Sequence, residues 1–366
     1  MVEKKTAVLA EIEAMESGAA SYLIDLLSEE KQDELAQLVV ENKFTSSFLK
    51  EKDEVTDESI TALYNYAKLT FDTGDYARAI KYLKYFRFLV DPASDMGFSA
   101  LWGKFAGELI LYEWGAAHES RRELEALIES RQSSHMDQLQ QRSWLLNWSL
   151  FLFFGDMDSL GDMIEMCLKD KYKNAIQTNV PWLLRYLTAA VIFKRRAMHR
   201  GGSNHNVARD LVKIIQQEHN TFRDPITTFL ESVYVDFDFE QAQIKLGECE
   251  ELLSTDYFLV FCKDDFMRNA RSFIFDTYLR IHQKVELDML ATKMQLKNEA
   301  GENDLEQTTR WVEELIQTGL NARIDVEAGT VVMTADHVEL YKQVTEATKK
   351  LGDKTMSLAQ RARDVL

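Results

Sequence analysis

The sequence predicts a mainly helical protein, a right-handed solenoid of repeated helical pairs of the TPR or HEAT type. Only 3 Pro and 15 Gly occur among 366 residues, so few positions interrupt a helix. Through most of the chain, apolar residues recur at intervals of three and four, which is the spacing of one helix face. The formal net charge of −17 argues against broad attraction to nucleic acid or to an anionic membrane.

Residues 1–59 are helical in pattern and strongly acidic, with fifteen Asp or Glu against six Lys or Arg. Their net charge of −9 is more than half of the excess carried by the whole chain. Two interpretations stay open for this segment. It is either a solvated helical start of the array or an acidic face for a basic partner.

The clearest helical pair covers residues 63–92. Gly74 and Asp75 break the helical pattern between its two halves. Ala67 and Ala79 are small enough to let the two helix backbones approach, and large apolar residues such as Phe86 would fill the space around them. A pair of this kind cannot bury its apolar face alone, so neighbouring pairs are expected on the rest of the chain.

Further pairs follow at intervals of about forty residues, at 101–128, 139–168, 181–193 with 207–217, and 225–253. In the last pair, Asp238, Phe239 and Ala242 repeat the arrangement of the first turn. The solenoid is therefore expected over residues 60–280.

The most apolar run, residues 144–154, is interrupted by Asn147 and Ser149 and is shorter than the ~20 residues that a membrane span needs. We expect it to form a buried helix, with Trp144, Trp148 and Phe151 in the packing.

The elements predicted for residues 281–335, a helix, a loop, a second helix and a hairpin, follow one another in the order of a winged helix. After an apolar helix at 257–280, the pattern predicts a short helix at 285–296, a polar loop at 297–304 and a helix at 306–318 that buries Trp311, Val312, Leu315 and Ile316. Two short strands, 322–325 and 330–334, follow as a hairpin in which Gly329 can supply a positive φ. The last domain, residues 336–366, is predicted to be one helix with Val344, Leu351, Leu358 and Val365 seven residues apart.

A solenoid that leads into a winged helix and a terminal helix resembles the PCI-domain family, the scaffold proteins of the proteasome lid, the signalosome and a translation initiation complex. The similarity covers roughly residues 60–365 and is carried by 64–83, 139–154, 174–192, 210–259, 273–294 and 322–333. It is strongest to a subunit of the initiation complex. Two departures are expected: the first helices of the family are absent before Met1, and the loop at 297–304 is longer.

The resemblance implies a non-enzymatic scaffold of the cytoplasm, or also of the nucleus, that supports assembly on the small ribosomal subunit. Sister PCI subunits would be its partners, and a subunit of the proteasome lid or signalosome is the alternative within the family. The resemblance also implies that neighbouring winged helices stack side by side and that terminal helices join a shared bundle. The residues at the edge of the winged-helix hairpin that bind a neighbour would then be Arg323, Ile324, Val331, Val332 and Met333. The apolar seam of the terminal helix in the bundle would consist of Val344, Leu351, Leu358 and Val365. A hairpin that only covers its own domain, and a terminal helix that packs on its own chain, are the alternatives.

No pattern in the sequence favours catalysis, a metal or a cofactor. Asp236, Asp238 and Glu240 form the most suggestive carboxylate cluster, and an all-helical hydrolase is the distant alternative that they would support. Their position between two helices instead favours an N-cap role for Asp238. The odd cysteine number, with Cys167, Cys249 and Cys262 far apart, predicts reduced core residues of an intracellular protein.

A basic run stands out in this acidic chain. It consists of Lys194, Arg195, Arg196 and Arg200 and is followed by two glycines. It is either a solvated loop with favourable charge at a helix C-terminus or a contact for ribosomal RNA or an acidic subunit. DNA binding by the winged helix is not expected, because its second helix carries Glu306, Glu313 and Glu314 beside only Arg310.

Overall fold

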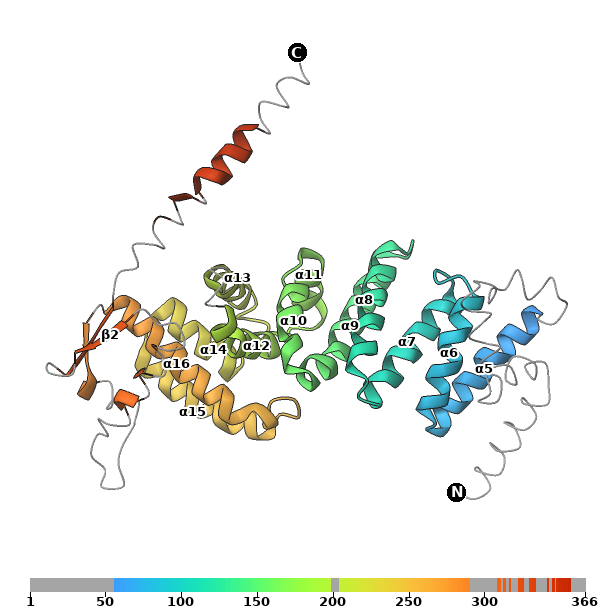
Figure 1. Cartoon of the computed structure of the whole chain (residues 1–366), viewed down its shortest axis with the longest axis horizontal. Helices are drawn as coiled ribbons and strands as arrows, with labels where there is room; N and C mark the ends of the chain where they lie inside the picture. The colour runs from blue at the N-terminus through green and yellow to red at the C-terminus, as the bar shows by residue number, and fades with distance from the viewer. Residues whose placement is uncertain are drawn as a thin grey trace, which may run out of the picture. The chain divides into compact units, whose positions relative to one another are not determined.

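The computed structural model describes residues 56–198, 204–282 and 284–289 and, beyond them, 308–310, 312–313, 316, 322–325, 329–333, 341, 344–345 and 347–356 (Figure 1). The chain divides into two compact units, Met1–Leu187 and Thr188–Leu366, and the division falls inside helix α12 (Leu183–Met198). Within the described residues, no helix is both long and apolar enough to cross a membrane.

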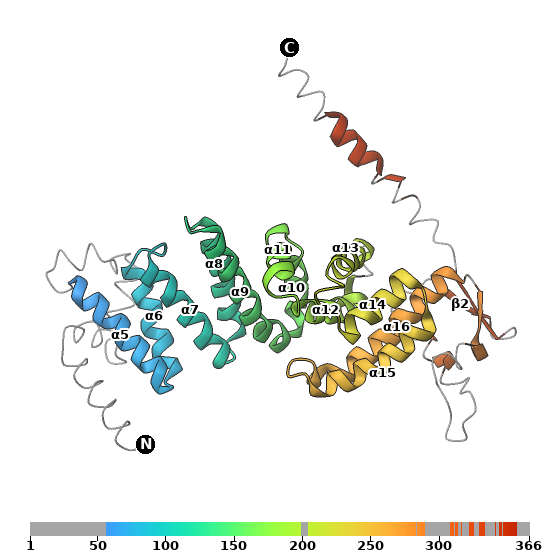
Figure 2. The same cartoon turned by 180° about the vertical axis from the view of Figure 1, so that it is seen from behind.

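The first unit is a succession of helices in which each packs on the next. These are α5 (Asp57–Thr73), α6 (Tyr76–Leu89), α7 (Asp95–Ile110), α8 (Trp114–Ser130), α9 (His135–Gly155), the short 3-10 turn η2 (Met157–Ser159), α10 (Leu160–Cys167) and α11 (Asp170–Asn179). Consecutive helices from α5 to α9 pack in pairs, and α11 returns to α9 (Figures 1 and 2). This nearest-neighbour packing is that of a helical solenoid and confirms the predicted fold class. Helix α11 was not among the predicted pairs.

The opening pair forms as predicted. Gly74 ends α5 with a φ of 93°, a left-handed conformation that glycine adopts without steric cost, and the Asp75 side chain accepts a hydrogen bond from the backbone N–H of Arg78 to start α6. Ala67, Ala79 and Phe86 are fully buried in the core between the helices.

Helix α9 differs from the prediction. Trp144, Trp148 and Phe151 are 49%, 42% and 43% exposed. The buried face consists instead of Leu145, Leu146, Leu150, Leu152 and Phe153. The helix is apolar on both faces, and its neighbours α8 and α11 cover only one of them. The prediction that the three aromatic residues are buried is wrong.

The second unit combines helices with a small sheet. Its helices are α13 (Asn204–Gln217), α14 (Pro225–Glu231), the π-helical turn η4 (Ser232–Asp236), α15 (Phe239–Thr255), the 3-10 turn η5 (Val260–Cys262) and α16 (Lys263–Ile281). Helix α16 starts later than the predicted residue 257. The Asp256 carboxylate accepts backbone hydrogen bonds from Phe258 and Leu259, which turns the chain before the helix can begin.

The sheet has three antiparallel strands, β1 (Lys284–Glu286), β2 (Ala322–Asp325) and β3 (Thr330–Met333), in the order β1-β3-β2. The predicted hairpin β2–β3 is present, and Gly329 has a φ of 58° in its turn. Strand β1 was predicted as the start of a helix at 285–296. Residues 287–289 are helical, and the remainder of that predicted helix lies outside the described residues.

Candidate interaction surfaces

The sheet rests on a compact core. Phe275 of α16, Val285 of β1, Val312, Ala322 of β2 and Val331 of β3 are all buried and pack together. Val312 and Ile316 face this core as predicted for the helix at 306–318, whereas Trp311 and Leu315 lie outside the described residues. The sheet, α16 and the helix that contains Val312 thus form one small domain with two sheet edges.

Strand β3 is not an edge, contrary to our prediction. It pairs with β1 through Lys284–Val332 and with β2 through Ile324–Val331, so its backbone groups are used on both sides. Val331 is also fully buried. The prediction that Val331, Val332 and Met333 line a free edge is therefore wrong, because an unpredicted strand occupies that side. Arg323 and Ile324 lie on β2, which has no strand on its outer side among the described residues.

The terminal helix presents apolar side chains to solvent. Its described residues between 341 and 356 are helical and exposed, with Val344 57% and Leu351 68% exposed. Leu358 and Val365 lie outside the described residues. A shared bundle with sister subunits stays a prediction for this helix, and packing on the chain's own winged helix stays the alternative.

The basic run is only partly described. Lys194 lies half-buried in α12, whose bounds also include Arg195 and Arg196, while Arg200 falls outside the described residues. The side chains of Arg195 and Arg196 also lie outside the described part of the chain, and the contact with RNA or an acidic subunit stays a prediction.

The carboxylate cluster has a structural role at Asp238. Its Oδ1 accepts hydrogen bonds from the backbone N–H groups of Glu240 and Gln241 at 3.1 and 3.0 Å, which caps α15 and confirms the predicted N-cap. Asp236 ends the π-helical turn. In the described part of the chain, no group of three or more His, Cys, Asp or Glu is placed to hold a metal ion.

Two of the three cysteines are buried core residues, as was predicted for all three. Cys167 and Cys249 are buried and Cys262 is half-buried. Burial raises the pKa of the Cys167 thiol to about 12, and the nearby Arg121 lowers it only in part. A thiol with so high a pKa is protonated at neutral pH and is a poor nucleophile.

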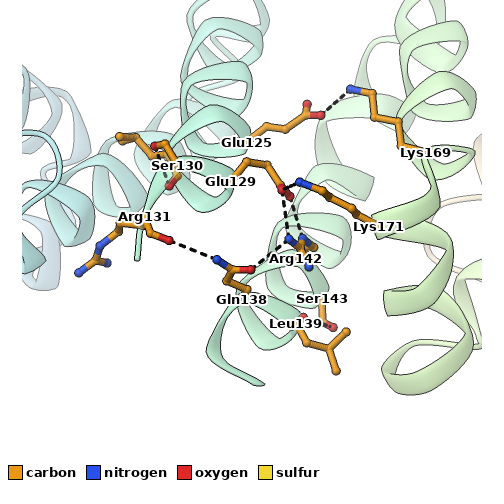
Figure 3. A network of polar contacts seen from close by, with 11 residues as sticks. Glu125, Glu129, Ser130, Arg131, Gln138, Leu139, Arg142, Ser143, Lys169 and Lys171 are labelled. Carbon is orange, nitrogen blue, oxygen red and sulfur yellow. Dashed lines mark hydrogen bonds and ion pairs between the residues drawn. The ribbon is translucent and has the colours of Figure 1, made fainter. Parts of the chain in front are cut away.

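A polar network ties α8, α9 and α11 together (Figure 3). Glu129 of α8 accepts hydrogen bonds from Arg142 of α9 at 2.8 and 3.1 Å and pairs with Lys171 of α11, while Glu125 pairs with Lys169 at 2.5 Å. Burial alone would raise the pKa of Glu129, but the hydrogen bonds from Arg142 and Lys171 outweigh it and hold the pKa below its usual value. The network fixes the orientation of α9, and with it the exposed aromatic face.

The described elements define a class of protein. PCI scaffold proteins consist of paired helices that lead into a winged helix, whose small sheet packs on a helix. The PCI domain family matches residues 242–335, which run from within α15 to just beyond β3. The chain is a PCI-domain protein.

Relatives that are similar to this chain over nearly its whole length show which family of PCI-domain proteins it belongs to. A relative from Arabidopsis thaliana, named as the E subunit of eukaryotic translation initiation factor 3, is 37% identical over 371 residues, which cover 98% of this chain and 80% of the relative. Relatives of the same name from Aspergillus fumigatus and Neosartorya fischeri are each 38% identical and cover 98% and 95% of this chain and 78% and 75% of their own length. The chain belongs to the family of the E subunits of eukaryotic translation initiation factor 3.

Proposed function

We propose that this chain is a non-enzymatic scaffold subunit of the cytoplasmic eukaryotic translation initiation factor 3 complex and supports assembly of that complex on the small ribosomal subunit. Similarity over 98% of the chain to relatives named as E subunits of this factor is the observation that carries the proposal. The interaction surfaces of the second unit supply a physical means of assembly.

The edges of the sheet are the first site at which a neighbouring subunit could attach. An edge strand carries N–H and C=O groups that a strand of a neighbouring subunit can pair with, which extends one sheet across two chains. Strand β2 presents Arg323 and Asp325 as exposed side chains and Ile324 half-buried, so an added strand would meet a short, mostly polar edge. The terminal helix offers the second attachment, through apolar side chains that a helical bundle would bury.

Proline substitution in β2 tests the edge. We compare Arg323→Pro with Ile324→Pro, because successive N–H groups of a strand point to opposite sides and only one of these two faces away from β3. The substitution at the outward-facing N–H should leave the sheet of this chain intact and weaken co-assembly with sister PCI subunits at least tenfold, about 1.4 kcal/mol. Co-expression and size-exclusion chromatography of the full chain measure this.

Lys284→Pro and Val285→Pro in β1 are the matched controls for the opposite edge. If assembly fails only with a β1 variant, the neighbouring subunit pairs there and the β2 assignment is wrong. If no variant in either strand affects assembly while far-UV circular dichroism is unchanged, strand addition contributes nothing to assembly.

A further inference from the structure

Helix α15 presents to solvent the side that lies opposite its packing. The helix packs on α14 and α16 (Figures 1 and 2), and its buried residues are Phe239, Ala242, Leu246, Cys249 and Leu253. On the other side, Glu240, Ile244, Gly247 and Glu251 follow at intervals of four, three and four, which places them in one row. All four residues are exposed, and Ile244 is 56% exposed. We call this row the outer face of α15.

Gly247 lies in the middle of the 17-residue helix α15. Glycine weakens a helix interior relative to alanine, because it loses more conformational freedom on folding. In the part of the chain that the structure describes, a Cβ at Gly247 would meet no atom within 4 Å. Gly115 and Gly161 are equally open, but they are the second residues of α8 and α10 and not interior. Packing within this chain therefore does not require a glycine at position 247.

Helix α7 shows what a glycine inside a helix does in this protein. A Cβ at Gly107 would lie 2.8 Å from Ile80, and one at Gly103 would lie 3.1 Å from Leu83. Both neighbours belong to α6, so these two glycines let two helices approach closely. Gly247 lies on a helix side that no second helix covers among the described residues. The same explanation then points to a helix from outside the chain.

The outer face of α15 carries two negative charges without a counter-ion. Within the described ranges, neither the Glu240 nor the Glu251 carboxylate makes an ion pair or a side-chain hydrogen bond. Lys245 is the only Lys or Arg in α15, and it pairs with Glu248 at 2.7 Å. The two free carboxylates are eleven residues apart on the helix, which is three turns or about 16 Å.

These features select a helix with positive charges. The two carboxylates would repel the phosphates of a nucleic acid. Lys and Arg side chains would instead pair with the carboxylates and cover the helix surface with their apolar stems. Because exposed ion pairs contribute little by themselves, most of the affinity would come from burial of Ile244 and from the close approach at Gly247. Helices that cross at about 20° can stay side by side over three turns.

We propose that the outer face of α15 binds a helix of a partner protein, which places a large apolar side chain over Gly247 and a Lys or Arg against each of Glu240 and Glu251. This goes beyond the proposed function, which concerns the sheet edges and the terminal helix, and it stands on different residues.

A designed helical peptide tests the proposal on the full chain. The probe is a fluorescent peptide of about five turns, with two Lys eleven positions apart, Leu four and seven positions after the first Lys, and Ala and Gln elsewhere. Fluorescence anisotropy should show saturable binding with a Kd below about 1 mM. Gly247→Leu should weaken binding at least tenfold, because the new side chain fills the space that the peptide would occupy. Glu251→Lys should weaken it at least threefold.

A matched control and a charge swap complete this test. Asp264→Lys is the control, because Asp264 is also exposed but belongs to α16, and it should change binding less than twofold. In the double variant Glu240→Lys and Glu251→Lys, a peptide with Glu in place of both Lys should bind more tightly than the original probe. The proposal would be overturned by a lack of saturable binding, by unchanged binding with Gly247→Leu, by equal losses with Asp264→Lys and Glu251→Lys, or by an unchanged preference of the double variant.

Gly247→Ala gives an independent readout. Alanine favours the helix, so hydrogen exchange of the α15 amides should slow or stay the same, while binding of the probe should weaken. Gly107→Ala is the matched control, because its Cβ would collide with Ile80. The α7 amides should then exchange faster, and binding of the probe should stay the same. Faster exchange in α15 with Gly247→Ala would show that the glycine serves the packing of this chain, and that result or unchanged binding of the probe would contradict the proposal.

Discussion

Replacing Phe275 with alanine should lower the free energy of unfolding of the second unit by about 3–5 kcal/mol. Phe275 is fully buried and joins α16 to all three strands through Val285, Ala322 and Val331. Its loss leaves a cavity at the point where the sheet meets the helices. Because β1, β2 and β3 have three or four residues each, they cannot form a stable sheet without this support.

Hydrogen exchange measured by mass spectrometry checks this prediction best, since the chain has two compact units and a single melting curve would mix them. Amides of β2 and β3 should lose protection, whereas those of α5 and α6 should keep it. Phe261→Ala is the matched control, because Phe261 is 88% exposed in the same unit and its removal should change stability by no more than about 0.5 kcal/mol. Equal loss of protection in both variants would contradict the role assigned to Phe275.

Removing residues 337–366 should abolish co-assembly with sister subunits while the melting temperature of the remaining chain stays the same. The described residues of the terminal helix, with Val344 and Leu351 among them, are exposed, so their removal takes away no internal packing of those residues. In a bundle, burial of each such side chain would contribute about 1.5–3 kcal/mol, and several of them together would dominate the affinity. Size-exclusion chromatography and thermal unfolding measure the two effects.

A point substitution distinguishes the contribution of the apolar seam to assembly from that of the terminal helix as a whole. Leu351→Asp should weaken assembly at least tenfold, about 1.4 kcal/mol. Lys349→Asp introduces the same residue on nearly the opposite side of the helix and should have little effect. A fall in melting temperature with Leu351→Asp would show instead that the helix packs on its own chain.

Much of the helical array was predictable because its signals are local. The turn at Gly74 and Asp75 and the cap at Asp238 depend on residues within a few positions, and their geometry follows the residue types. The turn of the β2–β3 hairpin was likewise a local signal, because Gly329, with its positive φ, directly precedes the β-branched residues that begin β3.

The predictions for α9 and β1 were wrong because tertiary packing, and not the local sequence, determines these parts of the structure. On α9, two apolar faces have the same helical spacing, and only the positions of α8 and α11 determine which of them is buried. Strand β1 has three residues, Lys-Val-Glu, too few for a period of two to stand out, and it becomes a strand only by pairing with β3. Because β3 is therefore paired on both sides, the outer strands of the sheet are β1 and β2, and the prediction that β3 is an edge was wrong.

Cross-linking mass spectrometry of the purified native complex tests the central claim, that this chain is a scaffold of the initiation factor 3 complex attached through its C-terminal end. Lys349, Lys350 and Lys354 are exposed on the terminal helix and can react with a lysine-specific cross-linker. We expect these lysines to cross-link to other subunits of initiation factor 3. Cross-links from them only to lysines of this chain, or to subunits of the proteasome lid or signalosome, would contradict the claim.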